Sequence, residues 1–425
     1  MQGLNVIFLV VGLMVALNAT MIVLTLGVKT LRTMREKRAA ARTRELEAAL
    51  DESLISGEAH RDLRGLAGRD LDYLAVPMIE YLSVLSGDQR ERMVALAEEA
   101  GLVDRYRRML ASGGRWRKAR AAENLGYLGG PGDVPALSGL LSHADETVRA
   151  VAARALARVG TPEAALALAK TLDDPSELTR LRMAENLERI GPLAVGPLVE
   201  TLGSGGPQAQ VLAARVLGNL RAAEARPALR AAVRGGSSTD VRAQATLSLG
   251  KIGDPEDVPV LLEVSDDEDW PVRAQVANAL EMIGDVSALL VLQRLTVDRE
   301  WWVRLNASRA LANMGPAGER ALARVLEGED RYARDRAAAS LGERGITRRV
   351  VGELAAPGEK GESARALVRA LVRAGATRYL GRLERTMPEG PERRVLVEIM
   401  ESEGPPTEET SARVRGASGE AEGAR

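Results

Sequence analysis

Apolar residues recur at helical spacing along most of the chain. The clearest block is VRAVAARALARVG at residues 148–160, where apolar side chains fall at positions i, i+3, i+4, i+7 and i+8 counted from Val148. Residues with this spacing share one face of an α-helix. The pattern therefore predicts an amphipathic helix that buries one face, both here and in each related block.

The block returns with an almost constant period. Its copies begin at residues 118, 149, 180, 210, 242, 273, 304, 334 and 364. Between them lie shorter apolar segments such as DVPALSGLLS (133–142), whose Pro135 suits the first turn of a helix, where no backbone donor is needed. Nine copies of a two-helix unit at this period predict a solenoid.

The predicted ends of the second helices carry the residues that helix ends favour. A glycine suited to a left-handed C-terminal turn follows most blocks, at Gly160, Gly191, Gly253, Gly284, Gly315, Gly345 and Gly375. Candidate N-caps precede them at Asp145, Ser176, Ser238, Asp269, Glu300 and Asp330. The copy that begins at Gln210 departs from the pattern because Arg221 replaces the glycine, which predicts a local irregularity in stacking.

The recurring Val-Arg-x-x-Ala-x-x-Ala-Leu-x-x-Ile-Gly string resembles HEAT repeats, in particular the short bacterial type first described in phycobilisome lyases. The resemblance covers residues 102–375, about nine units of ~31 residues. It implies an all-α fold, a right-handed α-α superhelix whose second helices line the concave face. It also implies that a repeated arginine pairs with an acidic residue of the neighbouring repeat. The arginines at that position are Arg149, Arg180, Arg242, Arg273, Arg304 and Arg334.

The N-terminal segment has a different character. Residues 1–28 contain no charged side chain, and ~23 helical residues span a hydrocarbon core of ~30 Å. We predict one transmembrane helix over 1–28; a buried helix and a cleaved signal peptide are the alternatives, although no basic residue precedes the apolar run. Small and polar residues on this helix are candidates for association with another helix: Gly12, Ala16, Asn18 and Thr20.

Positive charge follows this segment at once. Residues 29–58 form a predicted basic juxtamembrane helix, in which Lys29, Arg32 and Arg35 are the first of seven basic residues. Because basic residues stay on the cytoplasmic side, we predict a single-pass protein of the cell membrane, with its N-terminus outside and its repeat domain cytoplasmic. We further predict a helical N-terminal cap at 59–101, C-terminal capping helices at 376–403 and a disordered tail at 404–425.

Composition narrows the chemistry. The chain has 58 basic and 59 acidic residues, no cysteine and two histidines. Thiolate chemistry, cysteine-ligated zinc and a histidine-rich metal site are excluded. The sequence contains no phosphate-binding loop and no catalytic motif. We therefore predict no catalytic residue, no cofactor and no metal site.

Aromatic residues gather just before the repeated arginine. Trp270 and Trp301 lie three residues before it, and Trp302 and Tyr332 lie two before it. Equivalent positions follow one edge of a solenoid, so these side chains are candidate partner-binding residues. The alternative interpretation is that each ring packs over the next repeat. Basic residues in a column of the second helices are further binding candidates: Arg158, Arg189 and Lys251.

These features favour a scaffold or adaptor that binds a protein partner at the cytoplasmic face of the membrane, with an integral membrane protein as one candidate partner. Long repeat arrays offer extended surfaces rather than closed pockets, so we expect no small-molecule substrate and no enzymatic activity. Two alternatives stay open. One is a lyase-like enzyme or enzyme subunit, and the other is a nucleic-acid-binding solenoid, which the modest positive charge of the predicted concave face disfavours.

Overall fold

The computed structural model describes residues 2–56 and 60–403, and side chains from Met14 onward apart from residues 15, 16 and 19. The described chain is helical throughout and contains no strand. The tail predicted at 404–425 lies outside the described residues. The α-helices are α1 (Gln2–Ser56), α2 (Arg69–Val84), α3 (Gly87–Glu99), α4 (Leu102–Ser112), α5 (Arg115–Leu128), α6 (Val134–Gly139), α7 (Glu146–Val159), α8 (Pro162–Ala169), α9 (Glu177–Ile190), α10 (Val195–Ser204), α11 (Pro207–Asn219), α12 (Arg226–Gly235), α13 (Thr239–Ile252), α14 (Val258–Glu263), α15 (Trp270–Ile283), α16 (Leu289–Leu295), α17 (Trp301–Asn313), α18 (Gly315–Leu326), α19 (Arg331–Glu343), α20 (Ile346–Val351), α21 (Gly358–Arg373), α22 (Thr377–Thr386) and α23 (Pro391–Glu403).

The chain divides into two compact units, residues 1–168 and 169–425, called unit 1 and unit 2 below. Unit 1 contains α1 to α7 and most of α8. The C-terminal part of α1 packs on α2 and buries Leu46 and Leu50. Unit 2 contains the rest of the helices, and it holds all four aromatic binding candidates together with Arg189 and Lys251.

The prediction of a transmembrane helix over residues 1–28 is wrong. No helix in the described part of the chain has an apolar stretch long enough to cross a membrane. α1 is a single helix of 55 residues that continues past Lys29 to Ser56. Its described side chains between Met14 and Lys29 make a shorter apolar stretch than the ~20 residues that a bilayer requires. The predicted placement in the cell membrane, with the repeat domain cytoplasmic, is therefore wrong as well.

The residues expected to associate within the membrane all belong to α1. Gly12 and Ala16 lie outside the residues whose side chains the structure describes. Asn18 is exposed, and its Nδ2 donates a hydrogen bond to the Met14 carbonyl oxygen at 2.9 Å, so its amide is bonded within its own helix. Thr20 is exposed on the same helix.

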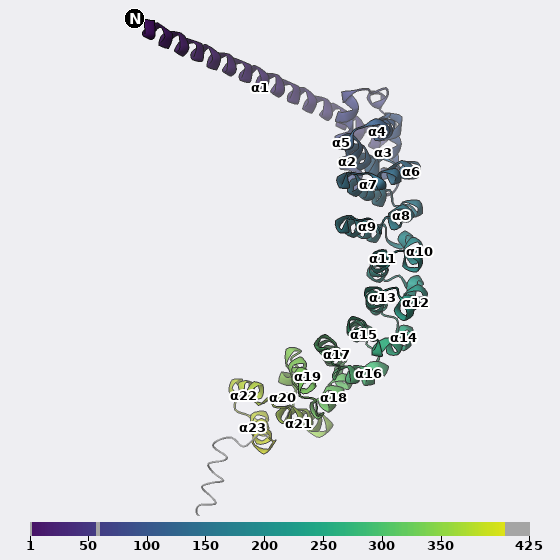
Figure 1. Ribbon diagram of the computed structural model, residues 1–425, viewed down its shortest axis with the longest axis vertical. Coiled ribbons are helices and arrows are strands. Elements are labelled where there is room, and N and C mark those ends of the chain that lie inside the picture. Colours follow the sequence, from purple (N-terminus) through teal and green to yellow (C-terminus); the bar gives the residue numbers. More distant parts are fainter. Residues whose placement is uncertain (1, 57–59, 404–425) are drawn as a thin grey trace, which may run out of the picture. The chain divides into compact units, whose positions relative to one another are not determined.

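Unit 2 has two layers of helices (Figure 1). The helices that contain the repeated string stack side by side as α9, α11, α13, α15, α17 and α19. The shorter helices α10, α12, α14, α16 and α18 form the second layer. The leucine seven residues after the repeated arginine is fully buried between the layers, as Leu249, Leu280 and Leu311 show. Burial of this recurring apolar face stabilises the stack, since each residue of this size contributes ~2 kcal/mol when removed from water.

Glycines let some neighbouring second helices approach closely. A Cβ atom built on Gly250 of α13 would lie 2.5 Å from the Cα of Ala279 on α15. A Cβ built on Gly218 of α11 would lie 2.7 Å from the Cβ of Ser248 on α13. Both distances are below van der Waals contact, so only glycine fits at these two crossings.

The predicted C-terminal glycines are confirmed. Each of the seven has a positive φ, from 62° at Gly315 to 88° at Gly375, although a ψ of −134° takes Gly191 out of the left-handed helical region. In the departing repeat Arg221 takes the same conformation, with φ of 50°. The left-handed turn is thus kept without a glycine, at the cost of strain for a residue with a Cβ.

The predicted N-caps divide into two groups. Asp145, Ser176, Ser238 and Asp330 accept a hydrogen bond from a backbone N–H in the first turn of the following helix. Asp269 and Glu300 make no such bond. Asp269 is used otherwise, because it accepts from the Thr239 hydroxyl and from Arg242.

Candidate functional site: an aromatic edge in unit 2

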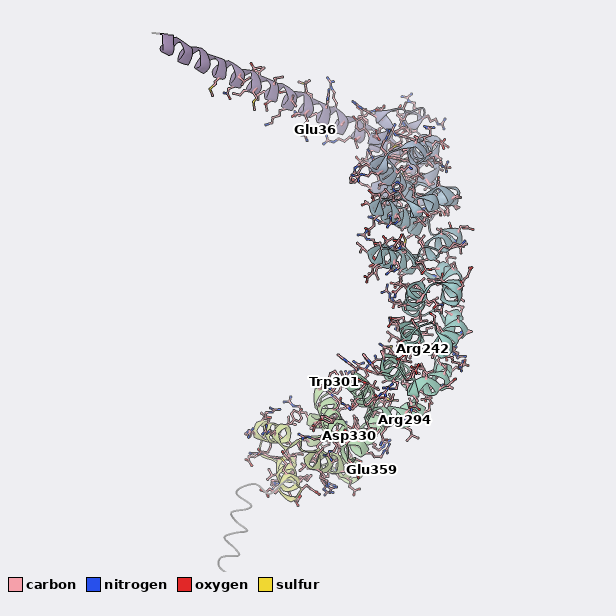
Figure 2. All side chains as sticks on the ribbon, viewed as in Figure 1. Glu36, Arg242, Arg294, Trp301, Asp330 and Glu359 are labelled. Carbon is pink, nitrogen blue, oxygen red and sulfur yellow. The ribbon has the colours of Figure 1, made fainter. Side chains whose placement is uncertain are left out.

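Four large aromatic side chains lie at the N-terminal ends of three successive second helices. Trp270 begins α15, Trp301 and Trp302 begin α17, and Tyr332 is the second residue of α19. We call these four residues the aromatic edge. Trp301 lies at the start of its helix, in the repeat before the one that contains Asp330 (Figure 2).

The rings of the aromatic edge are open to solvent. The exposed fractions are 40% for Trp270, 49% for Trp301, 54% for Trp302 and 70% for Tyr332. Trp301 and Trp302 meet edge to face, with ring centroids 4.7 Å apart and planes at 78°. The rings are therefore not packed beneath the next repeat, and they present apolar area that water covers in the free protein.

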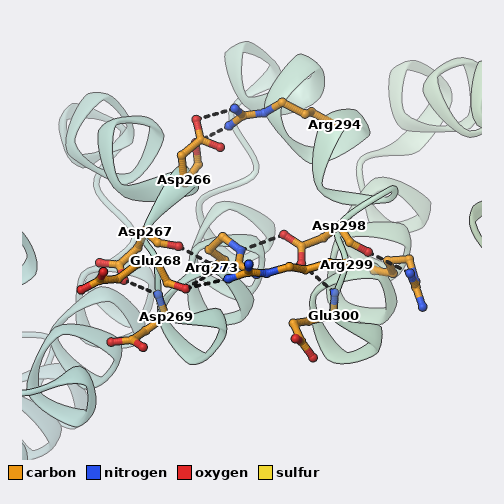
Figure 3. A network of polar contacts seen from close by, with 11 residues as sticks. Asp266, Asp267, Glu268, Asp269, Arg273, Arg294, Asp298, Arg299 and Glu300 are labelled. Carbon is orange, nitrogen blue, oxygen red and sulfur yellow. Dashed lines mark hydrogen bonds and ion pairs between the residues drawn. The ribbon is translucent and has the colours of Figure 1, made fainter.

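Arginine side chains hold the loops that precede these rings in the sequence (Figure 3). Arg273 is 5% exposed, and its Nε and Nη2 donate to both carboxylate oxygens of Asp298 in the next repeat, at 2.7 and 2.9 Å. Its Nη1 donates to the carbonyl oxygens of Asp267 and Glu268 at 2.8 and 3.0 Å. One guanidinium thus ties two consecutive loops together, and a two-pronged bond to a carboxylate is the strong form of this interaction.

The same arrangement continues on both sides of Arg273. Arg242 donates to both carboxylate oxygens of Asp267 at 3.0 and 3.1 Å and to Asp269 at 2.9 Å. Arg304 donates to the carbonyl oxygen of Asp298 at 2.8 Å, and its guanidinium lies 5.5 Å from the centre of the Tyr332 ring. We call the connected series Arg242, Asp267, Arg273, Asp298 and Arg304 the arginine ladder.

The remaining repeated arginines make the same bond to a carbonyl oxygen of the preceding loop. Arg180 donates to the carbonyl of Asp174 at 2.8 Å, and Arg334 to that of Gly328 at 3.1 Å. In unit 1, Arg149 donates to the carbonyl of His143 at 2.9 Å. Each of these acceptors lies six residues before its arginine, as Asp267 and Asp298 do in the ladder.

Arginines of the ladder lower the pKa of two acidic groups, Asp298 within the ladder and Asp269 beside it. Burial alone would raise the pKa of Asp298, but the hydrogen bonds from Arg273 and from the backbone N–H of Glu300 hold it below its usual value. The Thr239 hydroxyl and the Arg242 guanidinium lower the pKa of Asp269 against a smaller effect of burial. The bond to Asp298 raises the pKa of Arg273. The pair of Arg273 and Asp298 is therefore charged at neutral pH.

The basic binding candidates behave differently from one another. Lys251 donates from Nζ to Asn219 at 2.7 Å, and Asn219 donates to Glu188 at 2.6 Å. In unit 1, the Arg158 guanidinium lies 3.9 Å from the centre of the Tyr127 ring. Arg189 is exposed on α9. Two of the three candidates are thus engaged with neighbouring side chains of the chain itself.

A cavity of about 410 Å³ lies between α18, α20 and α21. In its charged wall, Arg349 donates to Glu319 at 2.6 Å and to Glu353 at 3.1 Å. The described residues contain no group of three acidic or histidine side chains placed to hold a metal ion. The aromatic edge is the more distinctive surface, since its rings are exposed.

The acidic partners of the ladder were not recognised from the sequence. Asp267 and Asp298 lie 25 residues after Arg242 and Arg273, in the loop of the next repeat. An aspartate six residues before the arginine does recur, at Asp174, Asp267 and Asp298. That recurrence was the available signal.

Comparison with known proteins agrees with the repeat pattern. A family profile described as HEAT repeats matches residues 109–188, 195–281 and 258–342, which together make more than half of the chain. A search of curated proteins finds no related sequence.

Several solved structures are similar. The complex of CpcE and CpcF of phycocyanin lyase from Nostoc sp. PCC7120 is 23% identical over 57% of this chain and 94% of that chain, with a TM-score of 0.33. An engineered protein is 21% identical over 84% of this chain and 99% of that chain, with a TM-score of 0.32. Kap121p is 12% identical over 85% of this chain, with a TM-score of 0.44, and the match spans 47% of its own length. At these identities the likeness concerns the fold alone.

Proposed function

Because the chain belongs to the HEAT-repeat family, we propose that it is an adaptor solenoid that binds a protein partner through the aromatic edge of unit 2. The exposure of Trp270, Trp301 and Trp302 carries this proposal, since each ring leaves 40 to 54% of its surface in water. Tryptophan and tyrosine contribute most to binding where they become buried at the centre of an interface. Three consecutive repeats place such rings at equivalent helix starts.

The arginine ladder supports the proposal in a second way. It fixes the loops that carry Trp270 and Trp301 through the bonds from Arg273 to both of them. A surface held in this way loses little conformational freedom when a partner binds, so more of the contact energy appears as affinity. The rings are thus both exposed and held on an ordered framework.

The test is affinity purification of the tagged full-length chain from its native cells, followed by mass spectrometry. The variant is Trp301→Ala with Trp302→Ala, and the control is Trp116→Ala, which removes a ring that is 69% exposed in unit 1. We expect one protein in near-equal amount with the wild type and the control, and its loss from the double variant. Circular dichroism must show that both variants keep their helices.

Two results would contradict the proposal. One is the same partner recovered equally with all three proteins, which would place the binding surface elsewhere. The other is the absence of any stoichiometric partner from the wild type, which would remove the adaptor role itself.

A further inference from the structure

The carboxylates beside the aromatic edge fall into two classes. Asp266, Asp267, Asp298 and Asp330 are used within the chain, by Arg294, Arg242, Arg273 and a helix N-terminus respectively. Glu268, Glu300 and Glu329 are different: among the described residues, none of their side chains has a hydrogen bond or an ion pair. These three glutamates precede Trp270, Trp301 and Tyr332, and the third loop also contains Glu327, whose exposed side chain has no such bond among the described residues either.

The surface around the rings is consequently acidic. The three loops 266–270, 298–302 and 327–332 together carry nine acidic residues and two basic ones. Of the basic residues, Arg299 donates to the Glu268 carbonyl at 3.1 Å and Arg331 pairs with Asp335 at 3.8 Å. The unpaired carboxylates attract cations and disfavour an acidic partner.

Exposed aromatic faces and free carboxylates together recognise one chemical group better than others. A guanidinium can lie over an aromatic ring while its N–H groups donate to a carboxylate. The edge already holds the aromatic half of this contact within the chain, because the Arg304 guanidinium lies over Tyr332 while it donates to the carbonyl oxygen of Asp298. A lysine ammonium can also lie over a ring face. It lacks the planar array of N–H groups that lets a guanidinium stack on the ring and donate to a carboxylate at the same time.

We propose that the aromatic edge binds an extended, arginine-bearing segment of its partner, with arginine side chains between the rings and Glu268, Glu300 and Glu329. This inference rests on the proposed function and adds the chemistry of the partner. Equivalent positions in neighbouring repeats are ~10 Å apart, the usual distance between packed helices. A polyproline II chain has three residues per turn and advances ~3.1 Å per residue, so arginines at every third position share one side and match the repeat.

The protein supplies its own probe. Three of the four tryptophans in the chain belong to the aromatic edge, and the fourth is Trp116 in unit 1. We would titrate the full-length chain with a Gly-Ser-Arg repeat peptide and follow tryptophan emission, with isothermal titration calorimetry as a second readout. Peptides of the same length with Glu or Lys in place of Arg serve as comparisons.

The variant carries Glu268→Gln, Glu300→Gln and Glu329→Gln. A charge-matched control carries Glu359→Gln, Glu362→Gln and Glu398→Gln, which lie on α21 and α23. We expect saturable binding of the Arg peptide, at least tenfold weaker for the first variant and unchanged for the control. The Lys peptide should bind several-fold more weakly than the Arg peptide, and the Glu peptide should not bind.

Equal binding of the Arg peptide by the wild type and the first variant would overturn the inference, and so would binding of the Glu peptide. The outcome also separates the two proposals. If the native partner is lost on replacement of Trp301 and Trp302 but the Arg peptide does not bind, the edge is the docking surface and its partner chemistry is wrong. If neither effect is seen, both proposals fail.

Discussion

Replacement of Gly250 by alanine tests the close crossing of α13 and α15. Gly250 lies inside α13, where an alanine would normally stabilise the helix by ~1 kcal/mol. Here the added Cβ would lie 2.5 Å from the Cα and 2.7 Å from the Cβ of Ala279. Carbon atoms prefer a separation of ~3.5 to 4.0 Å, so the two helices would have to part by about 1 Å.

The expected result follows from these two opposing effects. Overpacking of this kind costs ~1 to 3 kcal/mol, which exceeds the gain in helix propensity. We expect Gly250→Ala to lower the free energy of unfolding of the surrounding repeats by up to about 2 kcal/mol. The loss should be local, because each repeat in a solenoid contacts only its neighbours.

Hydrogen exchange measured by mass spectrometry is the suitable assay, since an array of this length need not unfold in a single transition. Protection of the amides in α13 and α15 should fall, and that of α22 should not change. Gly381→Ala on α22 is the matched control, because its new Cβ would meet only the Met400 methyl at 3.8 Å. This control should gain stability by about 1 kcal/mol. If Gly250→Ala gained protection as well, the reasoning from the close crossing would be refuted.

Three further predictions follow from individual contacts. Arg273→Met should destabilise the array by ~3 to 5 kcal/mol in urea unfolding, because it leaves Asp298 without its buried partner, and adding Asp298→Leu should recover most of the loss. Since the pKa of Asp298 is lowered by folding, the contribution of this pair is present above the unfolded pKa of ~4 and is lost as the pH falls through the folded value, so the difference between wild type and Arg273→Met should shrink in acid. Arg221→Gly should raise the free energy of unfolding by ~1 kcal/mol, because it relieves the strain of a φ of 50°. An unchanged midpoint of thermal unfolding would contradict that strain. Ultraviolet titration should show Tyr81 ionising at about 12, because it donates a hydrogen bond to Asp51, and Asp51→Asn should bring its pKa back toward 10.

The repeat pattern was predictable because its signals are local. The apolar spacing, the glycine after each block and most N-caps depend on residues within one helix, and the structure has them as expected at Gly253 and Ser238. The C-terminal turn at Arg221 shows where a local rule is too strict, since the stacked helices impose the left-handed conformation on a residue that does not favour it.

Contacts between repeats could not be predicted in the same way. Asp269 is a good N-cap by residue type, yet it bonds to Arg242 of the preceding repeat instead. The need for glycine at Gly250 depends on the distance to Ala279, which no single helix determines. The transmembrane prediction relied on charge and hydropathy alone, and α1 as described lacks a sufficient apolar stretch.

The arginine ladder also constrains how such a protein can change in length during evolution. Each aspartate of the ladder binds two arginines. The carboxylate of Asp298 accepts hydrogen bonds from the arginine 25 residues earlier, and its carbonyl oxygen accepts one from the arginine six residues later. An insertion or deletion that changes either distance breaks one of the two bonds. Gain or loss of a whole repeat keeps both distances. Duplication of complete repeats is therefore the tolerated route to a longer array, whereas small insertions are expected only in segments that carry neither end of these bonds.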